Sequence, residues 1–127
     1  MSLFDTRFFF EHYYSGDQTI LRKTRALLAT TTRAKYVSVV TVHEVYRLAL
    51  DKEGRDVAEL RTTLLEKDFA ILPMDNELAK VSAEMRSRYR IPMADSIIAA
   101  TAKFHRLRCI TDDPHLTQMK EIKTGWI

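Results

Sequence analysis

Short apolar stretches alternate with longer amphipathic stretches along the chain. Four apolar stretches, at residues 2–4, 36–40, 69–72 and 109–111, have the length and composition of strands, and the tail at 121–127 predicts a fifth. Between them, apolar residues recur every three or four positions, which is typical of helices that bury one face. This order predicts an α/β fold with a central parallel sheet of about five strands, covered by helices on both faces.

Polar caps and helix breakers set the expected ends of the helices. Asp17 and Asp75 are predicted N-caps, Gly54 closes one helix, and Pro92 interrupts the helical pattern. The expected helices cover residues 6–15, 17–33, 41–54, 55–67, 75–85 and 94–105. Because no linker, repeat or low-complexity segment separates these elements, we expect a single domain over residues 1–127.

Composition narrows the class of protein further. The chain has 127 residues and a net charge of +3, which permits a polyanionic partner without requiring one. It contains no apolar run near the roughly 20 residues that span a bilayer, and its first residues do not resemble a secretory signal. The single cysteine, Cys109, is expected in the core. We therefore expect a soluble, cytoplasmic protein with no membrane segment.

Four acidic residues stand in otherwise apolar surroundings: Asp5, Glu44, Asp95 and Asp113. Such carboxylates are costly to bury unless a cation neutralises them, and Mg²⁺ or Mn²⁺ is held by carboxylate oxygens. Each follows a predicted strand closely or opens a helix next to one, and sites in parallel sheets form at the carboxyl ends of the strands. The sequence therefore predicts a shared cation site, although Asp5 alone also fits a simple turn with Thr6.

Ordinary structural roles are available for the other three acids. Thr41 and Glu44 match the S/T-x-x-E capping box, in which Glu44 is a helix cap. Asp113 precedes Pro114 and fits an N-cap with proline at the first helical position. Asp95 fits a first-turn acid that interacts with the helix dipole. The common placement of the four acids, more than any one of them, indicates the cation site.

Other chemistries lack their sequence signals. The three glycines are scattered, so neither a Walker loop nor a dinucleotide-binding fingerprint is present, and no G-x-S-x-G elbow supports a serine nucleophile. The histidines show no zinc spacing and are interpreted as surface or helix-end residues: His12, His43, His105 and His115. Acyl transfer and zinc chemistry are therefore not indicated.

Several cationic and aromatic residues are candidates for substrate contact. Arg86, Arg88 and Arg90 surround an aromatic residue, which suits phosphate contact and base stacking, and also fits a solvated helix end. Arg7 follows Asp5 closely and is a candidate for a substrate phosphate, with an ion pair to Glu11 as the alternative. The aromatic residues near the N-terminus exceed what one helix face buries, so we expect part of the group to meet a partner: Phe8, Phe9, Phe10, Tyr13 and Tyr14.

The ordered segments FDT, T-x-x-E, ADSIIAATA and TDDPHL resemble the PIN-domain family, and the size and layout resemble its VapC-type toxin ribonucleases. The resemblance covers essentially the whole chain. It implies that Asp5, Glu44, Asp95 and Asp113 form a metal-binding quartet, with Thr6 and Thr111 as polar support. The chain departs from the family pattern at Arg7, where serine or asparagine is common, and at Leu116, where phenylalanine is usual. Asp112, next to Asp113, is a second candidate for the fourth carboxylate.

The resemblance implies a Mg²⁺- or Mn²⁺-dependent endoribonuclease that cleaves single-stranded or loop RNA, the toxin of a toxin–antitoxin pair. It further implies a small antitoxin partner and a homodimer. A non-catalytic module that binds RNA or protein, with the acids acting as caps, is the alternative function. Phosphoryl transfer is a weaker alternative because no lysine follows a strand where it would polarise a phosphoryl group.

Overall fold

The computed structural model describes residues 1–30 and 34–127, so the predicted end of the second helix, at residues 31–33, lies outside the described part. Five strands form one sheet: β1 Ser2–Phe4, β2 Lys35–Ser38, β3 Ala70–Leu72, β4 Arg108–Ile110 and β5 Thr124–Gly125. The helices are α1 Thr6–Tyr14, α2 Gln18–Thr30, α3 Val39–Glu53, α4 Arg55–Asp68, α5 Asn76–Tyr89, α6 Met93–His105 and α7 Pro114–Thr117. The predicted α/β class is confirmed.

All strand pairs in the sheet are parallel, in the order β3-β2-β1-β4-β5. The first strand of the chain is therefore the central one, and Leu3 lies opposite Tyr36 of β2 and Cys109 of β4. Because the strands are parallel, their carboxyl ends meet at one edge of the sheet. The chain leaves β1 toward β2 on one side and reaches β4 on the other, which is where such sheets form their sites.

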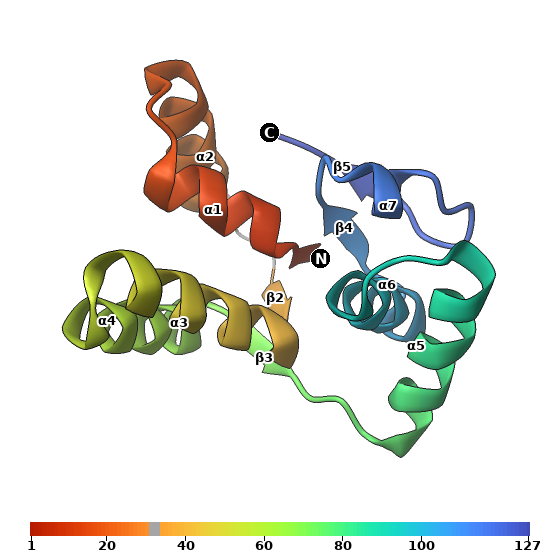
Figure 1. Ribbon diagram of the computed structural model, residues 1–127. Helices are drawn as coiled ribbons and strands as arrows, with labels where there is room; N and C mark the ends of the chain where they lie inside the picture. Colours follow the sequence, from red (N-terminus) through yellow and green to blue (C-terminus); the bar gives the residue numbers. More distant parts are fainter. Residues whose placement is uncertain (31–33) are drawn as a thin grey trace.

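Helices cover both faces of the sheet, as predicted (Figure 1). Phe4, Val37 and Ile110 face a cluster formed with α1, α3 and α4, which includes Phe8 and Phe9. Alternate strand residues, Leu3 and Cys109, face a second cluster with α5, α6 and α7. This alternation follows from the two-residue period of a strand, and it places Cys109 in the core as expected.

The local sequence explains where several helices begin. Asp5 is the N-cap of α1, Asp75 the N-cap of α5, and Asp113 the N-cap of α7 with proline at its first position. The Asp17 carboxylate accepts a hydrogen bond from Thr19 N at 2.8 Å at the start of α2. The N-cap predictions for Asp17, Asp75 and Asp113 are confirmed.

The capping-box interpretation of Glu44 is wrong. The second strand ends at Ser38 rather than at residue 40, and the Ser38 hydroxyl caps α3 by accepting a hydrogen bond from Val40 N at 3.2 Å. Thr41 therefore lies inside the helix, where it is fully buried. A serine that satisfies an early helix N–H ends the strand sooner than the β-branched residues after it suggest.

Smaller corrections apply elsewhere. Phe69 is the C-cap of α4 and precedes β3, and the fourth strand ends at Ile110, one residue before the predicted end. The fifth strand is shortened to Thr124–Gly125. Among the described residues, no helix is long and apolar enough to cross a membrane.

Candidate metal centre

All four predicted acids line one cavity of about 240 Å³ at the carboxyl edge of the sheet. Asp5 follows β1, Glu44 lies in α3, Asp95 lies in the first turn of α6, and Asp113 follows β4. Residues from four separate parts of the chain thus meet at one place. The remaining lining residues are Thr6, Arg7, Phe10 and Leu48.

Asp5 lies deepest and is 2% exposed. Its Oδ1 accepts a hydrogen bond from Thr6 N at 2.7 Å, and its Oδ2 accepts one from the Thr111 hydroxyl at 2.7 Å. The pKa of Asp5 is raised to about 7, chiefly by burial and also by the charges of Asp95 and Asp113, while the hydrogen bonds from Thr111 and Thr6 act in the opposite direction. Asp5 is therefore an oriented carboxyl group whose charge the two hydrogen bonds only partly stabilise.

Glu44 is oriented by a threonine pair. The Thr6 hydroxyl donates to Glu44 Oε1 at 2.6 Å, and it also lies 3.2 Å from the Thr41 hydroxyl. The contact with the carboxylate is the shorter of the two, so the Thr6 hydroxyl is held chiefly by Glu44 and lies against Thr41. Thr6 therefore joins Asp5 and Glu44 through its backbone and its side chain.

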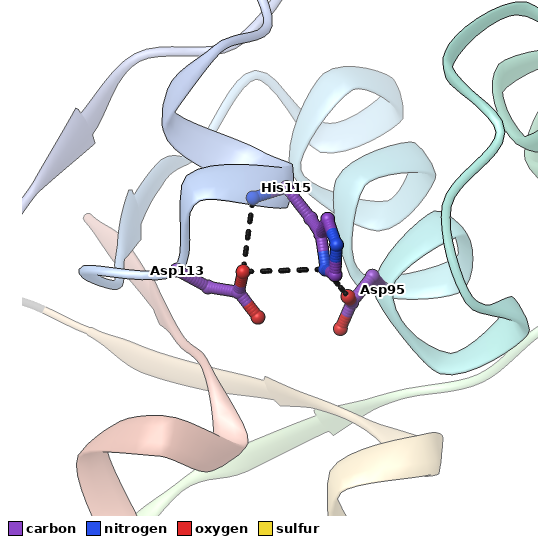
Figure 2. A group of neighbouring side chains, drawn as sticks. All are labelled: Asp95, Asp113 and His115. Atoms are coloured by element: carbon purple, nitrogen blue, oxygen red, sulfur yellow. Dashed lines mark hydrogen bonds and ion pairs between the residues drawn. The ribbon is translucent and has the colours of Figure 1, made fainter.

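Asp95 and Asp113 share a histidine that the sequence did not single out. His115 Nδ1 lies 2.8 Å from Asp95 Oδ2 and 3.4 Å from Asp113 Oδ1, so the ring stands between the two carboxylates (Figure 2). Burial raises the pKa of Asp95, the charge of Asp113 adds to this, and the hydrogen bond to His115 opposes it. Since carboxylates accept hydrogen bonds, Nδ1 is the protonated nitrogen in this arrangement.

The signal for His115 was available but weak. It lies two residues after Asp113, and the Asp113 carboxylate accepts a hydrogen bond from His115 N at 2.9 Å as the cap of α7. A residue at this position of a capped turn lies beside the capping carboxylate. Its approach to Asp95 depends on how α6 packs on α7, which a single sequence does not specify.

Asp112 and Asp113 point to different partners. Asp112 is exposed and binds the guanidinium of Arg7 through both oxygens, at 3.1 and 3.2 Å. It does not line the cavity, whereas Asp113 does. Arg7 also lies 3.6 Å from Glu11, so the ion pair predicted as an alternative role for Arg7 is present. Arg7 lines the cavity as well.

The other three candidate arginines lie elsewhere. Arg86 and Arg88 are in the last turn of α5, and Arg90 caps its end in the left-handed conformation. Arg88 pairs with Glu121 at 3.3 Å, and Arg86 Nε donates to the carbonyl of Ile91 at 3.3 Å. None of the three lines the acidic cavity.

The donor set of the cavity fits a hard divalent cation. Its donors are carboxylate oxygens, which Mg²⁺ and Mn²⁺ prefer. Ligand atoms of Asp95, Asp113 and His115 all lie within 4.8 Å of one another. Among the described residues, Arg7 is the one cation that lines the cavity, and its guanidinium is engaged by Asp112 and Glu11. A bound cation would therefore lower the cost of burying these acids.

A parallel sheet with an acid-lined cavity at its carboxyl edge defines an α/β domain with an acidic centre suited to a divalent cation. The chain belongs to the PIN domain family, whose model matches residues 2–122. PIN domains are generally nucleases. The family resemblance noted from the sequence is thereby confirmed.

Solved structures agree with this assignment. A toxin–antitoxin complex from Klebsiella pneumoniae is 26% identical, with a TM-score of 0.77 and 100% of each chain covered. FitAcB from Neisseria gonorrhoeae is 27% identical, with a TM-score of 0.78 over 98% of this chain and 96% of that one. VapC20 of Mycobacterium tuberculosis, a Sarcin-Ricin loop cleaving toxin, shares the fold at 15% identity, with a TM-score of 0.79 over 97% and 99% of the two chains. No curated protein matches the chain.

Proposed function

We propose that the protein is a Mg²⁺- or Mn²⁺-dependent endoribonuclease that cleaves single-stranded or loop RNA. The observation that carries the proposal is the meeting of Asp5, Glu44, Asp95 and Asp113 in one cavity at the carboxyl edge of the sheet. An acidic cavity is a poor site for an RNA phosphate by itself. It becomes a suitable site when divalent cations reverse the local charge.

Asp5, Glu44, Asp95 and Asp113 would hold the metal. When bound, the ion supplies Lewis acidity toward the phosphate and makes water available as a nucleophile near neutral pH. The raised pKa of Asp5 supports this role, because a buried carboxyl group with that pKa gains charge compensation from a cation. His115 is the nearest group able to carry a proton at Asp95 and Asp113.

Neighbouring residues of the chain position the acids. Thr6 holds Glu44 and Asp5, and Thr111 holds Asp5, through hydrogen bonds of 2.6 to 2.7 Å. Such outer hydrogen bonds fix the orientation of metal ligands. Thr6 and Thr111 are therefore positioning residues in the proposed reaction.

Arg7 is the candidate for contact with the substrate phosphate at the cavity, because it already lies there in a two-point contact with an exposed carboxylate. An RNA phosphate offers the same fork of acceptors as Asp112 and would exchange with it. Arg86, Arg88 and Arg90 stay predictions for substrate contact outside the cavity.

Similarity to toxin–antitoxin proteins supports the biological part of the proposal. The chain would act in the cytoplasm as the toxin of a pair, as a homodimer that a small cognate antitoxin holds inactive. The loop-cleaving activity given for VapC20 supports loop RNA as a substrate, since loops expose bases and phosphates that an A-form helix hides.

The test is cleavage of a mixed RNA pool by the purified protein with Mn²⁺, with EDTA, and with Asp95→Asn. We expect cleavage only with the metal, and a loss of at least about 100-fold in the variant, because even the partners of metal ligands contribute 10–100-fold. Activity that is indifferent to both chelation and the substitution would reject the proposal.

The alternative, a non-catalytic binding module, is favoured by one observation: Asp5 and Asp113 do serve as N-caps. It predicts no stabilisation by divalent ions, whereas a native metal site raises the melting temperature by mass action. A melting curve with and without Mn²⁺ therefore separates the two functions before any substrate is known.

A further inference from the structure

The acidic cavity has an aromatic wall that neither the metal nor the core requires. Phe8 and Phe9 are buried in the core cluster of α1, α3 and α4. Phe10, the next residue, is half-buried, belongs to neither core cluster among the described residues, and lines the cavity together with Leu48. One of the three consecutive phenylalanines thus faces the proposed catalytic site.

The position of Phe10 follows from the pairing of α1 with α3. Residues four apart share a helix face, so Thr6, Phe10 and Tyr14 follow one another along α1, as Glu44, Leu48 and Lys52 do along α3. Thr6 bonds to Glu44, Phe10 and Leu48 line the same cavity, and the Lys52 ammonium lies 5.2 Å from the Tyr14 ring centre. The surface therefore changes stepwise from acidic to apolar to aromatic and cationic along the two helices.

This order suits a single strand of RNA leaving the metal site. The acids and their metal act on the phosphodiester, a flat apolar group one helical turn away can receive a base, and the exposed Lys52 beyond it offers charge to the backbone. Stacking on an aromatic ring tolerates any base and needs the base to be unpaired. A duplex would keep its bases away from Phe10.

We propose that Phe10 stacks on the base of a nucleotide next to the cleaved phosphodiester and so selects unpaired RNA. The inference rests on the proposed ribonuclease function and adds a specificity-determining residue to it. The Phe10 and Tyr14 ring centres lie 5.8 Å apart with planes inclined by 49°, so the Phe10 ring has an aromatic neighbour on α1, and its cavity side stays available for a base.

The experiment combines protein variants with abasic substrates. Wild-type protein with Mn²⁺ is given a short single-stranded RNA that it cleaves at one site, and a series in which one nucleotide near that site lacks its base. We expect the wild type to lose roughly tenfold in kcat/KM at one neighbouring position, a typical value for one stacked base. Phe10→Leu should show about the same tenfold loss of kcat/KM on the intact RNA. On the abasic RNA that the wild type cleaves poorly, its kcat/KM should equal that of the wild type.

Three further variants complete the design. Phe10→Tyr retains the ring and should recover most of the activity that Phe10→Leu loses on the intact RNA, together with the loss on the abasic RNA. Phe10→Met is a second ring-free variant of similar volume in case Phe10→Leu does not fold. Phe104→Leu removes an exposed phenylalanine of α6 that does not line the cavity, and should match the wild type on every substrate.

The outcomes separate the two proposals. If the wild type shows no metal-dependent cleavage, the proposed function fails. The function stands but the stacking role of Phe10 is wrong in either of two cases. In the first, the ring-free variants keep the same kcat/KM as Phe104→Leu. In the second, they lose kcat/KM on every abasic RNA in addition to the loss that the missing base causes.

Discussion

Thr111 donates a hydrogen bond to Asp5 Oδ2 at 2.7 Å, joining the residue after β4 to the residue after β1. The same hydroxyl accepts a hydrogen bond from Asp113 N at 3.0 Å. Thr111 is fully enclosed, with 1% of its surface exposed. One buried hydroxyl therefore fixes the geometry of two of the four acids.

Replacing Thr111 by valine keeps its shape and removes this hydroxyl. Because the hydrogen bond opposes the raised pKa of Asp5, its loss makes the carboxylate harder to ionise and less well oriented. We expect Mn²⁺ affinity near neutral pH to fall by about 10–100-fold, measured by calorimetric titration. Thr101→Val is the matched control: Thr101 is equally buried, bonds to the carbonyl of Ile97, and does not touch the site. Equal affinities of the two variants would contradict the positioning role of Thr111.

The raised pKa of Asp5 predicts a pH-dependent stability of the metal-free protein. Between the ordinary value of 3.8 and about 7, the native state holds a proton that the unfolded chain has released. The contribution of Asp5 is therefore complete at acid pH and is lost as the pH rises through about 7. In EDTA, we expect Asp5→Asn to gain stability over the wild type as the pH rises.

The melting temperatures of the wild type and Asp5→Asn, taken in EDTA from about pH 5 to 8, measure this difference. Asparagine can retain the cap of α1 through its side-chain oxygen but loses the hydrogen bond from Thr111, so the pH dependence of the difference, rather than its size, reports the charge of Asp5. A difference in melting temperature that does not change with pH would show that burial does not raise the pKa of Asp5.

The neighbours Asp112 and Asp113 offer a matched pair of substitutions. Asp113 lines the cavity and Asp112 binds Arg7, so Asp113→Asn should abolish most of the Mn²⁺-induced rise in melting temperature and Asp112→Asn should preserve it. Both changes remove one negative charge, and the two positions are adjacent. Thermal melts with increasing Mn²⁺ decide the question, and a larger loss for Asp112→Asn would move the fourth ligand to that residue.

Gly54 joins α3 to α4 with a φ of 94°, a conformation that side chains rarely adopt. A Cβ added there would meet no atom within 4 Å, so strain is the main cost, and Gly54→Ala should reduce the free energy of unfolding by about 1–3 kcal/mol. Gly16→Ala, at an exposed glycine with equal space and no positive φ, should cost much less. Urea unfolding of both variants tests this, and equal losses would mean that backbone strain is not the cause.

The layers of the fold and the meeting of the four acids could be predicted from the sequence. The period of the apolar residues distinguishes strands from helices, and parallel strands place Asp5 and Asp113 at one edge without any knowledge of packing. The boundary at Ser38 was missed because Val39 and Val40 favour a strand locally, while the serine cap and burial against the sheet favour a helix. Local preference and tertiary context disagreed there, and tertiary context prevailed.

Contacts between side chains of distant elements were beyond a single sequence. The place of His115 between Asp95 and Asp113 depends on the approach of α7 to α6, and the pairing of Arg7 with Asp112 joins residues 105 positions apart. Arg86, Arg88 and Arg90 form a sequence pattern suited to nucleic acid, yet the fold turns them to another part of the surface than the acidic cavity. Residue type indicates what chemistry a side chain can perform, and the topology of the fold decides which side chains lie at the same site.

The hydrogen bond between Thr111 and Asp5 joins residues that lie 106 positions apart in the chain. Asp5 is synthesised first and Asp113 last, so a partly synthesised chain lacks at least one of the four acids. Under the proposed function, RNA cleavage would therefore begin only after synthesis has passed residue 113 and β4 has paired with β1.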